Sequence, residues 1–346
     1  MGVCFFTVVG VGVIIRRRLG SERRRRVFPS YAGGGALPLS EGRRSHTGTR
    51  AARRAAPEMS GKAQQTTVAR PVSVEGIGLH SGERCGARLL PAEVDSGVVF
   101  AIGSAVEVPG RAEFVVGTDR GTVLGAGGVR VGCVEHVMAA LYGMGVDNVR
   151  VEVEGPELPA LDGSAAEWVK ALRRARRRRL GAARGGGRLE RPVWASDGDA
   201  WVVAVPASGG LSLAVVVDFE GTAAGRQTLW LKLTRRSFAR ELAPARTFAT
   251  KEEVEALRAA GLARGGGPEN AFAVGRDGYS GPLRFGDEVV RHKALDLVGD
   301  VALCGRQLSG QVIAVRPGHR VNVAMARAVG RAFGECRAQE HEARSD

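Results

Sequence analysis

Hydrophobic and polar positions along the chain predict two stretches of short strands, each interrupted by helices. In the first stretch, residues 66–153, short apolar segments alternate with Gly and Pro turns, which is typical of strands. Residues 134–142 contain neither Gly nor Pro and are apolar nearly all round, so they predict a buried helix that ends before Gly143. The other segments in this stretch that we expect to be strands are residues 87–90, 97–102 and 148–154.

The pattern begins again after Leu189 and predicts a second mixed unit. Asp287 is the expected N-cap of one of its helices, and Gly305 is the expected stop of that same helix. This second mixture of strands and helices makes the predicted fold class α+β. In this unit we expect strands at 201–205, 211–217 and 310–315 and helices at 251–260, 288–303 and 320–333.

A basic segment lies between the two stretches. A helix is expected over residues 165–179, with Asp162 of the preceding Asp-Gly-Ser turn as its cap. The helix continues into an arginine-rich run, residues 173–188. Such a run is usually a solvated helix end and loop, and contact with nucleic acid is the alternative. No aromatic residue interrupts it, which argues against stacking on single-stranded bases.

The chain is long enough for two medium-sized domains, with 346 residues of which 44% are hydrophobic. Its first part is typical of a targeting segment and not of a folded domain, because residues 1–60 contain twelve arginines and only three acidic residues. We therefore predict an unstructured organellar transit peptide, for the mitochondrion rather than the plastid. A non-native leader is the alternative. The predicted parts are the transit peptide 1–62, domain I 63–180, the basic Gly/Arg-rich linker 181–188, domain II 189–335 and the tail 336–346.

Charge and cysteine content argue against several classes of protein. The formal net charge is +14, but the excess is concentrated in the leader and in residues 173–188. The rest of the chain therefore does not have the basic character typical of a nucleic-acid-binding domain. The apolar run at residues 4–15 is too short to span a bilayer, and no basic region precedes it as in a secretory signal. The five cysteines show no C-x-x-C spacing, which predicts neither a disulfide framework nor a thiolate zinc site.

Chemistry is indicated most clearly at residues 291–300. His292 and Asp296 are four residues apart, so both lie on one face of the expected helix and can both bind a metal. Far upstream, Glu135 directly precedes His136. Two His and one Asp are a ligand set typical of hydrolytic zinc sites, and Glu135 would remain free as a base.

Several motifs appear in an order that makes the pattern specific. Over about residues 65–335 the chain resembles the zinc-dependent UDP-3-O-acyl-N-acetylglucosamine deacetylases of lipid A synthesis. One departure is Cys133, which stands where the family usually has a small hydroxyl residue that would be expected to cap the helix. The motifs are Gly78-Leu79-His80-Ser81-Gly82, Val134-Glu135-His136, Leu161-Asp162-Gly163-Ser164, Arg246-Thr247-Phe248, Asn270-Ala271-Phe272 and Gly318-His319.

The resemblance implies a fold and a reaction. The expected fold is two similar layered β-sheet and helix domains packed as a sandwich, with the active site between them. The expected reaction is hydrolysis of the acetamide of a UDP-linked acylated amino sugar. The resemblance implies one zinc ion on His136, His292 and Asp296, with Glu135 as the general base.

Other roles also follow from the resemblance. Thr247 is expected beside the oxyanion, and His319, expected on a loop, is the cation that steadies the oxyanion or protonates the leaving amine. Asp300 would orient His319, and its spacing puts it on the same helix face as the ligands. Lys293 lies about 100° round the helix from His292, where it can reach a sugar hydroxyl or the diphosphate. Phe248 is the remaining substrate-binding residue.

Three alternatives remain open at this point. The chain can be a zinc deacetylase of another acylated amino sugar, a basic nucleic-acid-binding protein, or an inactive family member with a structural role. The complete set of polar site residues argues against the last. We expect a monomer with no stable membrane span and no nucleic acid partner.

Overall fold

The computed structural model describes residues 7–8, 13–14, 63–103 and 106–342. Ser60–Asp346 form one compact unit. Within Met1–Met59, the strands β1 (Thr7–Val8) and β2 (Val13–Ile14) pair with each other in antiparallel fashion. Most of the expected leader, and the end of the expected tail, lie outside the described residues.

The first half of the compact unit is built on a five-stranded sheet. Its central strand pairs antiparallel with one neighbour and parallel with the other. Val149, Val151 and Val153 of this central strand are buried while the residues between them are not, so one face of the sheet packs against the core. In sheet order the strands are β4 (Val72–Ile77), β5 (Arg84–Pro91), β11 (Val149–Glu154), β6 (Val98–Ile102) and β7 (Val106–Pro109).

The second half is built on a larger sheet. Its strand β16 alternates buried Leu213, Val215 and Val217 with half-buried residues, so again one face is turned to the core. A short strand, β13 (Gly187–Arg188), pairs with β20 outside the main path. In sheet order the other strands are β14 (Val193–Asp197), β15 (Ala200–Val205), β20 (Leu308–Val315), β16 (Leu211–Phe219) and β17 (Gly225–Lys232).

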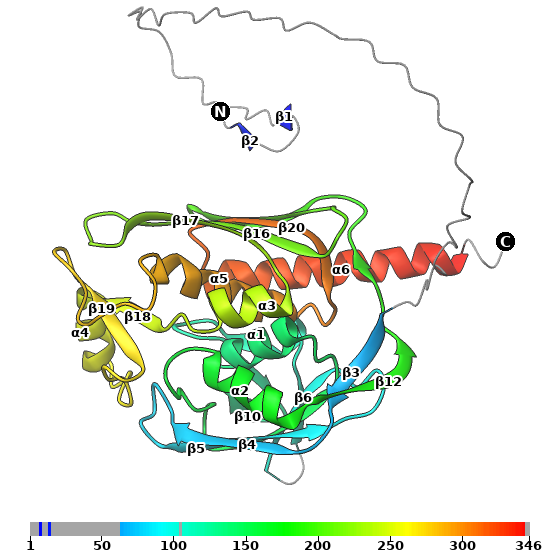
Figure 1. Cartoon of the computed structure of the whole chain (residues 1–346), viewed down its shortest axis with the longest axis horizontal. Helices are drawn as coiled ribbons and strands as arrows, with labels where there is room; N and C mark the ends of the chain where they lie inside the picture. The colour runs from blue at the N-terminus through cyan, green and yellow to red at the C-terminus, as the bar shows by residue number, and fades with distance from the viewer. Residues whose placement is uncertain (1–6, 9–12, 15–62, 104–105, 343–346) are drawn as a thin grey trace, which may run out of the picture. The chain divides into compact units, whose positions relative to one another are not determined.

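The helices lie between the two sheets, as Figure 1 shows. The first half contributes α1 and α2 to this layer, the second half contributes α5 and α6, and α1 packs directly against α5. The predicted α+β sandwich is therefore confirmed. The bounds are α1 (Glu135–Met144), α2 (Ala166–Ala175), α5 (Glu288–Ala302) and α6 (His319–Glu342).

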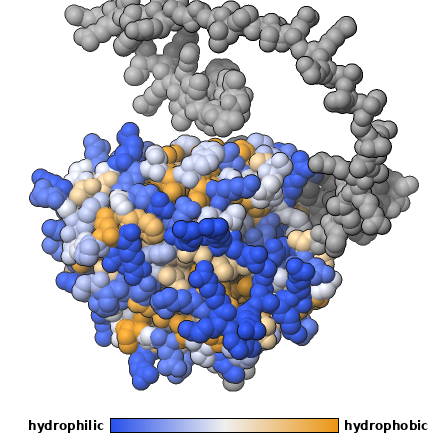
Figure 2. Space-filling model, in the orientation of Figure 1, coloured by the Kyte–Doolittle hydropathy of each residue, from blue (hydrophilic) through white to orange (hydrophobic). Residues whose placement is uncertain are grey.

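Smaller elements complete the compact unit. The parallel pair β18–β19 and helix α4 form a group at one end of the molecule, on the left of Figure 1. Figure 2, in the same orientation as Figure 1, shows that the face turned to the viewer is mostly hydrophilic, with smaller apolar areas. The bounds are β3 (Gln64–Val68), η1 (Ala112–Phe114), β8 (Val115–Gly117), β9 (Val123–Ala126), β10 (Val129–Val131), β12 (Arg177–Ala183), α3 (Arg235–Ser237), η2 (Phe238–Leu242), β18 (Thr247–Thr250), α4 (Lys251–Ala259) and β19 (Ala271–Val274).

Helix ends differ from the prediction in three places. Helix α1 continues through Gly143, which the Phe238 ring approaches too closely for a side chain at residue 143, and it ends at Gly145 in the left-handed conformation. Helix α2 ends at Ala175, and the following arginines belong to β12, which pairs with β3 and runs into the expected linker. Helix α6 extends well beyond Phe333.

Asp287 occupies the N-cap position of α5 as expected, but its side chain makes no capping hydrogen bond within the described chain and accepts one from Arg291 instead. The expected cap at Asp162 is wrong. Asp162 accepts hydrogen bonds from Ser164 and Arg284, while Ala165 occupies the N-cap of α2. Among the helices of the described residues, none combines the length and the apolar character that a bilayer crossing needs.

Candidate active site

A cavity of about 720 Å³ lies between helices α1 and α5 and the β18–β19 group. Eight of the nine residues that the sequence singled out line it, which brings together motifs that are far apart in the chain. The ninth, Asp300, is fully buried. The eight are Glu135, His136, Thr247, Phe248, His292, Lys293, Asp296 and His319.

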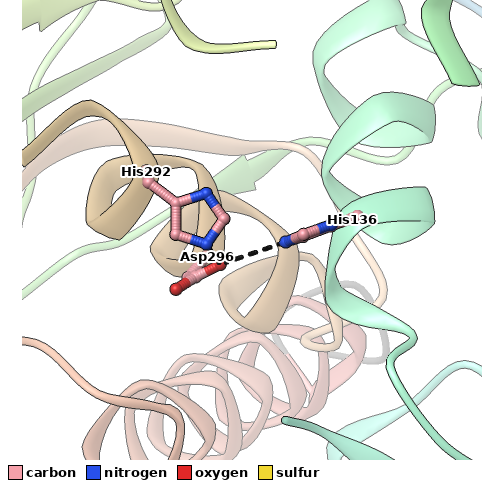
Figure 3. Close-up of side chains that lie close together, drawn as sticks. All are labelled: His136, His292 and Asp296. Carbon is pink, nitrogen blue, oxygen red and sulfur yellow. Dashed lines mark ion pairs between the residues drawn. The ribbon is translucent and has the colours of Figure 1, made fainter. Parts of the chain in front are cut away.

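Three of these side chains converge on one point, as Figure 3 shows. The Nε2 atom of His136 on α1 lies 3.5 Å from Oδ1 of Asp296 on α5. The Nε2 atom of His292, one helix turn before Asp296, lies 3.4 Å from that same oxygen. All three ligand atoms lie within 4.8 Å of one another.

The donor atoms of this cluster fit a metal ion. Oδ1 of Asp296 is buried and has no hydrogen-bond partner in the described part of the chain, which is costly for a carboxylate oxygen unless a cation binds it. Nδ1 of His292 lies 3.1 Å from the carbonyl oxygen of Ala245. If Nδ1 donates its proton there, Nε2 keeps its lone pair for a metal. Two imidazole nitrogens and one carboxylate suit zinc.

The charge states of His292 and Asp296 agree with this use. Burial lowers the pKa of His292 to about 4, so its ring is neutral at pH 7. Burial also lowers the pKa of His136, but the neighbouring carboxylates of Asp296 and Glu135 outweigh burial and raise it. Asp296 stays ionised, because His292 and Lys293 outweigh its burial and hold its pKa well below the usual range.

Glu135 stands in the first turn of α1, directly before His136. Its side chain is almost fully buried, and its Oε2 accepts a hydrogen bond of 2.9 Å from the main-chain N–H of Thr122. Burial raises the pKa of Glu135, although the nearby His319 and His136 partly oppose the shift. A carboxylate with a raised pKa is a better proton acceptor, so the position suits a general base.

His319 and Asp300 form a second polar pair. Nδ1 of His319 lies 2.9 Å from Oδ2 of Asp300, as the expected orienting role requires. Burial alone would lower the pKa of His319, but the carboxylates of Asp300 and Glu135 outweigh burial and raise the pKa to about 9. The ring is therefore cationic at neutral pH. The expectation that His319 lies on a loop is wrong, because it is the first residue of α6.

The expected substrate contacts line the cavity, with partners of their own. Oγ1 of Thr247 donates a hydrogen bond of 2.9 Å to the carbonyl of Gly163, so this hydroxyl would have to turn to meet an oxyanion. Nζ of Lys293 lies 3.0 Å from Oδ2 of Asp296. The Phe248 ring packs edge-on against His292, with ring centroids 5.9 Å apart. The roles of these residues stay predictions.

Cys133 and His80 lie at the edge of the cavity. Val134, not Cys133, is the N-cap of α1, so the expectation that Cys133 replaces a capping residue is wrong. The Cys133 thiol donates to Oε2 of Glu157, and burial raises its pKa well above the usual range, which suits a structural residue. Glu157 also accepts the main-chain N–H of His80 and so fixes that loop.

Sequence reasoning missed four groups that hold the site together. Each contributes a single hydrogen bond or a small set of them, and none belongs to a motif with a spacing that points to the site. Asp300, for example, accepts from Oγ1 of Thr122 at 2.6 Å and from Nδ2 of Asn322 at 3.0 Å. The four are Thr122, Glu157, the Ala245 carbonyl and Asn322.

Comparison with known proteins gives consistent results. A family model described as UDP-3-O-acyl N-acetylglycosamine deacetylase matches residues 65–331. A UDP-3-O-acyl-N-acetylglucosamine deacetylase of Anaeromyxobacter dehalogenans is 45% identical over 268 residues, which cover 77% of this chain and 87% of the relative. Proteins of the same name from Myxococcus xanthus and a Nostoc species are 43% and 39% identical, over 86% and 98% of their lengths and 77% of this chain. The region that the family model matches contains every site residue named in this subsection.

Proposed function

The chain belongs to the family of UDP-3-O-acyl N-acetylglycosamine deacetylases, and on this basis we propose that it hydrolyses the acetamide of UDP-3-O-acyl-N-acetylglucosamine. The products are acetate and the UDP-linked 3-O-acyl-glucosamine, in a step of lipid A biosynthesis. The observation that carries the proposal is the convergence of His136, His292 and Asp296 beside a buried carboxylate and a cationic histidine, all in one cavity.

The metal we propose is zinc, held by His136, His292 and Asp296. A zinc ion in this position supplies Lewis acidity, which polarises the acetamide carbonyl and lowers the pKa of water at the site. Oδ1 of Asp296, which is buried and has no hydrogen-bond partner among the described residues, supports this assignment, as does the neutral state of His292.

The protein's own groups move the protons. Glu135 takes a proton from the attacking water, because its raised pKa makes it a stronger base than an exposed carboxylate. His319 carries a positive charge that stabilises the developing oxyanion, and it can then give its proton to the departing amine. Asp300 keeps the ring of His319 in place through the 2.9 Å contact to Nδ1.

The cavity also fits the rest of this substrate. Lys293 and Thr247 supply polar groups for the sugar and the oxyanion, and Phe248 supplies an aromatic surface. The lining also includes apolar side chains, which suit an acyl chain. These apolar lining residues include Leu79, Val254, Leu257, Ala263 and Phe272.

An assay of metal content together with deacetylation tests the proposal. The full chain should contain about one zinc per molecule, since three protein ligands and one open position make a catalytic zinc site. It should release acetate from UDP-3-O-acyl-N-acetylglucosamine far faster than from UDP-N-acetylglucosamine, which lacks the acyl chain. If the zinc-loaded protein prefers another acylated amino sugar, the proposed reaction would stand and the proposed substrate would be contradicted.

We propose in addition that residues 1–62 direct the protein to the mitochondrion. The support is the arginine-rich, acid-poor composition of this segment. A fluorescent protein fused behind residues 1–62 should accumulate in mitochondria, while a plastid or diffuse cytosolic signal would contradict the proposal.

We also propose that the enzyme is a monomer, which sedimentation of the full chain tests directly.

A further inference from the structure

Thr122 lies in the turn between β8 and β9 and is fully buried, in contact with Glu135 of the catalytic cavity. The turn comes so close to the site that a β-carbon on the preceding Gly121 would lie 3.2 Å from Oε1 of Glu135. The carbonyl of Thr122 accepts a hydrogen bond from the main-chain N–H of Val134, just before α1 begins. The turn is therefore fixed to the helix that presents the base.

Thr122 contacts both proton-transfer groups at once. Its main-chain N–H donates to Oε2 of Glu135 at 2.9 Å, and its hydroxyl donates to Oδ1 of Asp300 at 2.6 Å. Its Oγ1 also lies 3.5 Å from Nδ1 of His319. One residue from the connection between β8 and β9 thus joins groups that α1, α5 and α6 present separately.

We propose that Thr122 is a positioning residue that holds the Glu135 carboxylate and the His319–Asp300 pair in one fixed arrangement. The inference rests on the proposed function, since it concerns the groups that move protons there. A hydroxyl has a single proton, and the short contact gives this proton to Oδ1 of Asp300. Oδ2 of Asp300 is then left to accept from His319 and Asn322, so the carboxylate cannot rotate away from the ring.

Three substitutions separate positioning from simple packing. Thr122→Val keeps the shape and the main-chain N–H but removes the hydroxyl, whereas Thr122→Ser keeps the hydroxyl and removes a methyl group. A packing role predicts that Ser is the worse replacement, and a positioning role predicts that Val is. Thr67→Val is the matched control, because it removes another fully buried hydroxyl, one that accepts from the main chain of Ala92 away from the cavity.

Steady-state kinetics of the zinc-loaded full chain should show the difference. Loss of a group that orients a catalytic residue typically costs about 10- to 100-fold in activity, so kcat of Thr122→Val should fall by that factor while KM and zinc content stay constant. Thr122→Ser and Thr67→Val should stay close to wild type in kcat. In an Asp300→Asn background, Thr122→Val should cause no further loss, because its partner has already changed.

The outcomes that overturn the inference are specific. Wild-type kcat in Thr122→Val, or an equal loss in Thr122→Ser, would leave only a packing role. If Thr122→Val does not fold, Thr122→Ala takes its place and should still lose kcat where Ser retains it. Nuclear magnetic resonance of ¹⁵N-labelled histidines gives a readout without substrate: the ring signals of His319 should move in Thr122→Val and not in Thr67→Val. That readout remains valid if the proposed substrate proves wrong.

Discussion

Gly299 of α5 lies against the main chain of Glu135 on α1, so closely that a β-carbon at residue 299 would overlap the carbonyl oxygen of Glu135. The two helices therefore meet at backbone distance. Asp296 lies about one turn before this contact and His136 directly after it, which explains how ligands from distant motifs reach one point.

Gly299→Ala should therefore separate the helices and disturb the site. Overpacking of a tight core position typically costs about 1–3 kcal/mol, and zinc affinity should fall as His136 moves away from Asp296. Urea unfolding and metal titration measure the two effects. Gly334→Ala in α6 is the matched control: a β-carbon meets nothing there, and alanine in an exposed helix should stabilise by about 0.5–1 kcal/mol. Normal stability and zinc binding in Gly299→Ala would show that the close contact is dispensable.

A buried ion pair next to the cavity makes a second prediction. Glu288 is fully buried and accepts hydrogen bonds from the main chain and the guanidinium of Arg246. Arg246→Ala would leave this carboxylate uncompensated, which typically costs about 3–5 kcal/mol. Thermal and denaturant unfolding should show the loss. Arg226→Ala, which removes an exposed partner of Asp218, should leave the unfolding midpoint nearly unchanged.

The same pair sets a dependence on pH. Burial alone would raise the pKa of Glu288, but hydrogen bonds from Arg246 and from the main chain of Arg284 outweigh it and lower the pKa. The pair therefore adds stability above the unfolded pKa of about 4.3, and this contribution is lost as pH falls through the lower, folded value. Arg246→Ala removes the group that lowers this pKa, so the acid loss that comes from Glu288 should shrink, and the difference in stability between wild type and variant should narrow as pH falls. Identical acid unfolding of the two proteins would show that the pair contributes nothing.

The sequence predicts the parts of this molecule that depend on local spacing. His292 and Asp296 were expected on one helix face, and the structure places them there, because a four-residue step fixes their direction whatever surrounds the helix. The position of Thr122 could not be predicted in this way. Its contacts to Glu135 and Asp300 cross 13 and 178 residues of chain, and only the tertiary packing brings them together.

The basic segment shows a different limit. Arg177 to Arg179 continue the composition of α2, so the run was assigned to the helix, but these residues form β12 by pairing with β3 more than a hundred residues upstream. Arginine is compatible with either structure, and the partner strand decides. Similarly, Pro317-Gly318 was interpreted as a loop around His319, whereas the helix begins directly after the turn.

The protonation state of His319 gives a further prediction. Its pKa of about 9 lies above the ordinary value of about 6.5, so the cation is present below pH 9 and is lost as pH rises through that value. The kcat of the zinc-loaded enzyme should therefore fall on the alkaline side near pH 9. Asp300→Asn removes the charge that raises this pKa, so the fall should begin at lower pH. Asp218→Asn, which changes a half-buried carboxylate outside the cavity lining, should leave the profile where it is. An unshifted profile in Asp300→Asn would remove His319 as the titrating acid.

The role of Glu135 is the centre of the proposed chemistry, because it divides the site into groups that hold the metal and a group that takes the proton. Glu135→Gln keeps the size of the side chain and removes the proton acceptor. His292→Ala is the contrasting variant, since it removes a proposed ligand and should lose zinc as well as activity.

The most direct measurement is kcat per bound zinc for Glu135→Gln with UDP-3-O-acyl-N-acetylglucosamine. Loss of a general base typically lowers the rate by about 10²- to 10⁴-fold, so kcat should fall by that factor while KM and zinc content stay near wild type. Loss of zinc in this variant would make Glu135 a ligand. A near-normal kcat in the zinc-loaded variant would transfer the base role to His319 and contradict the assignment made here.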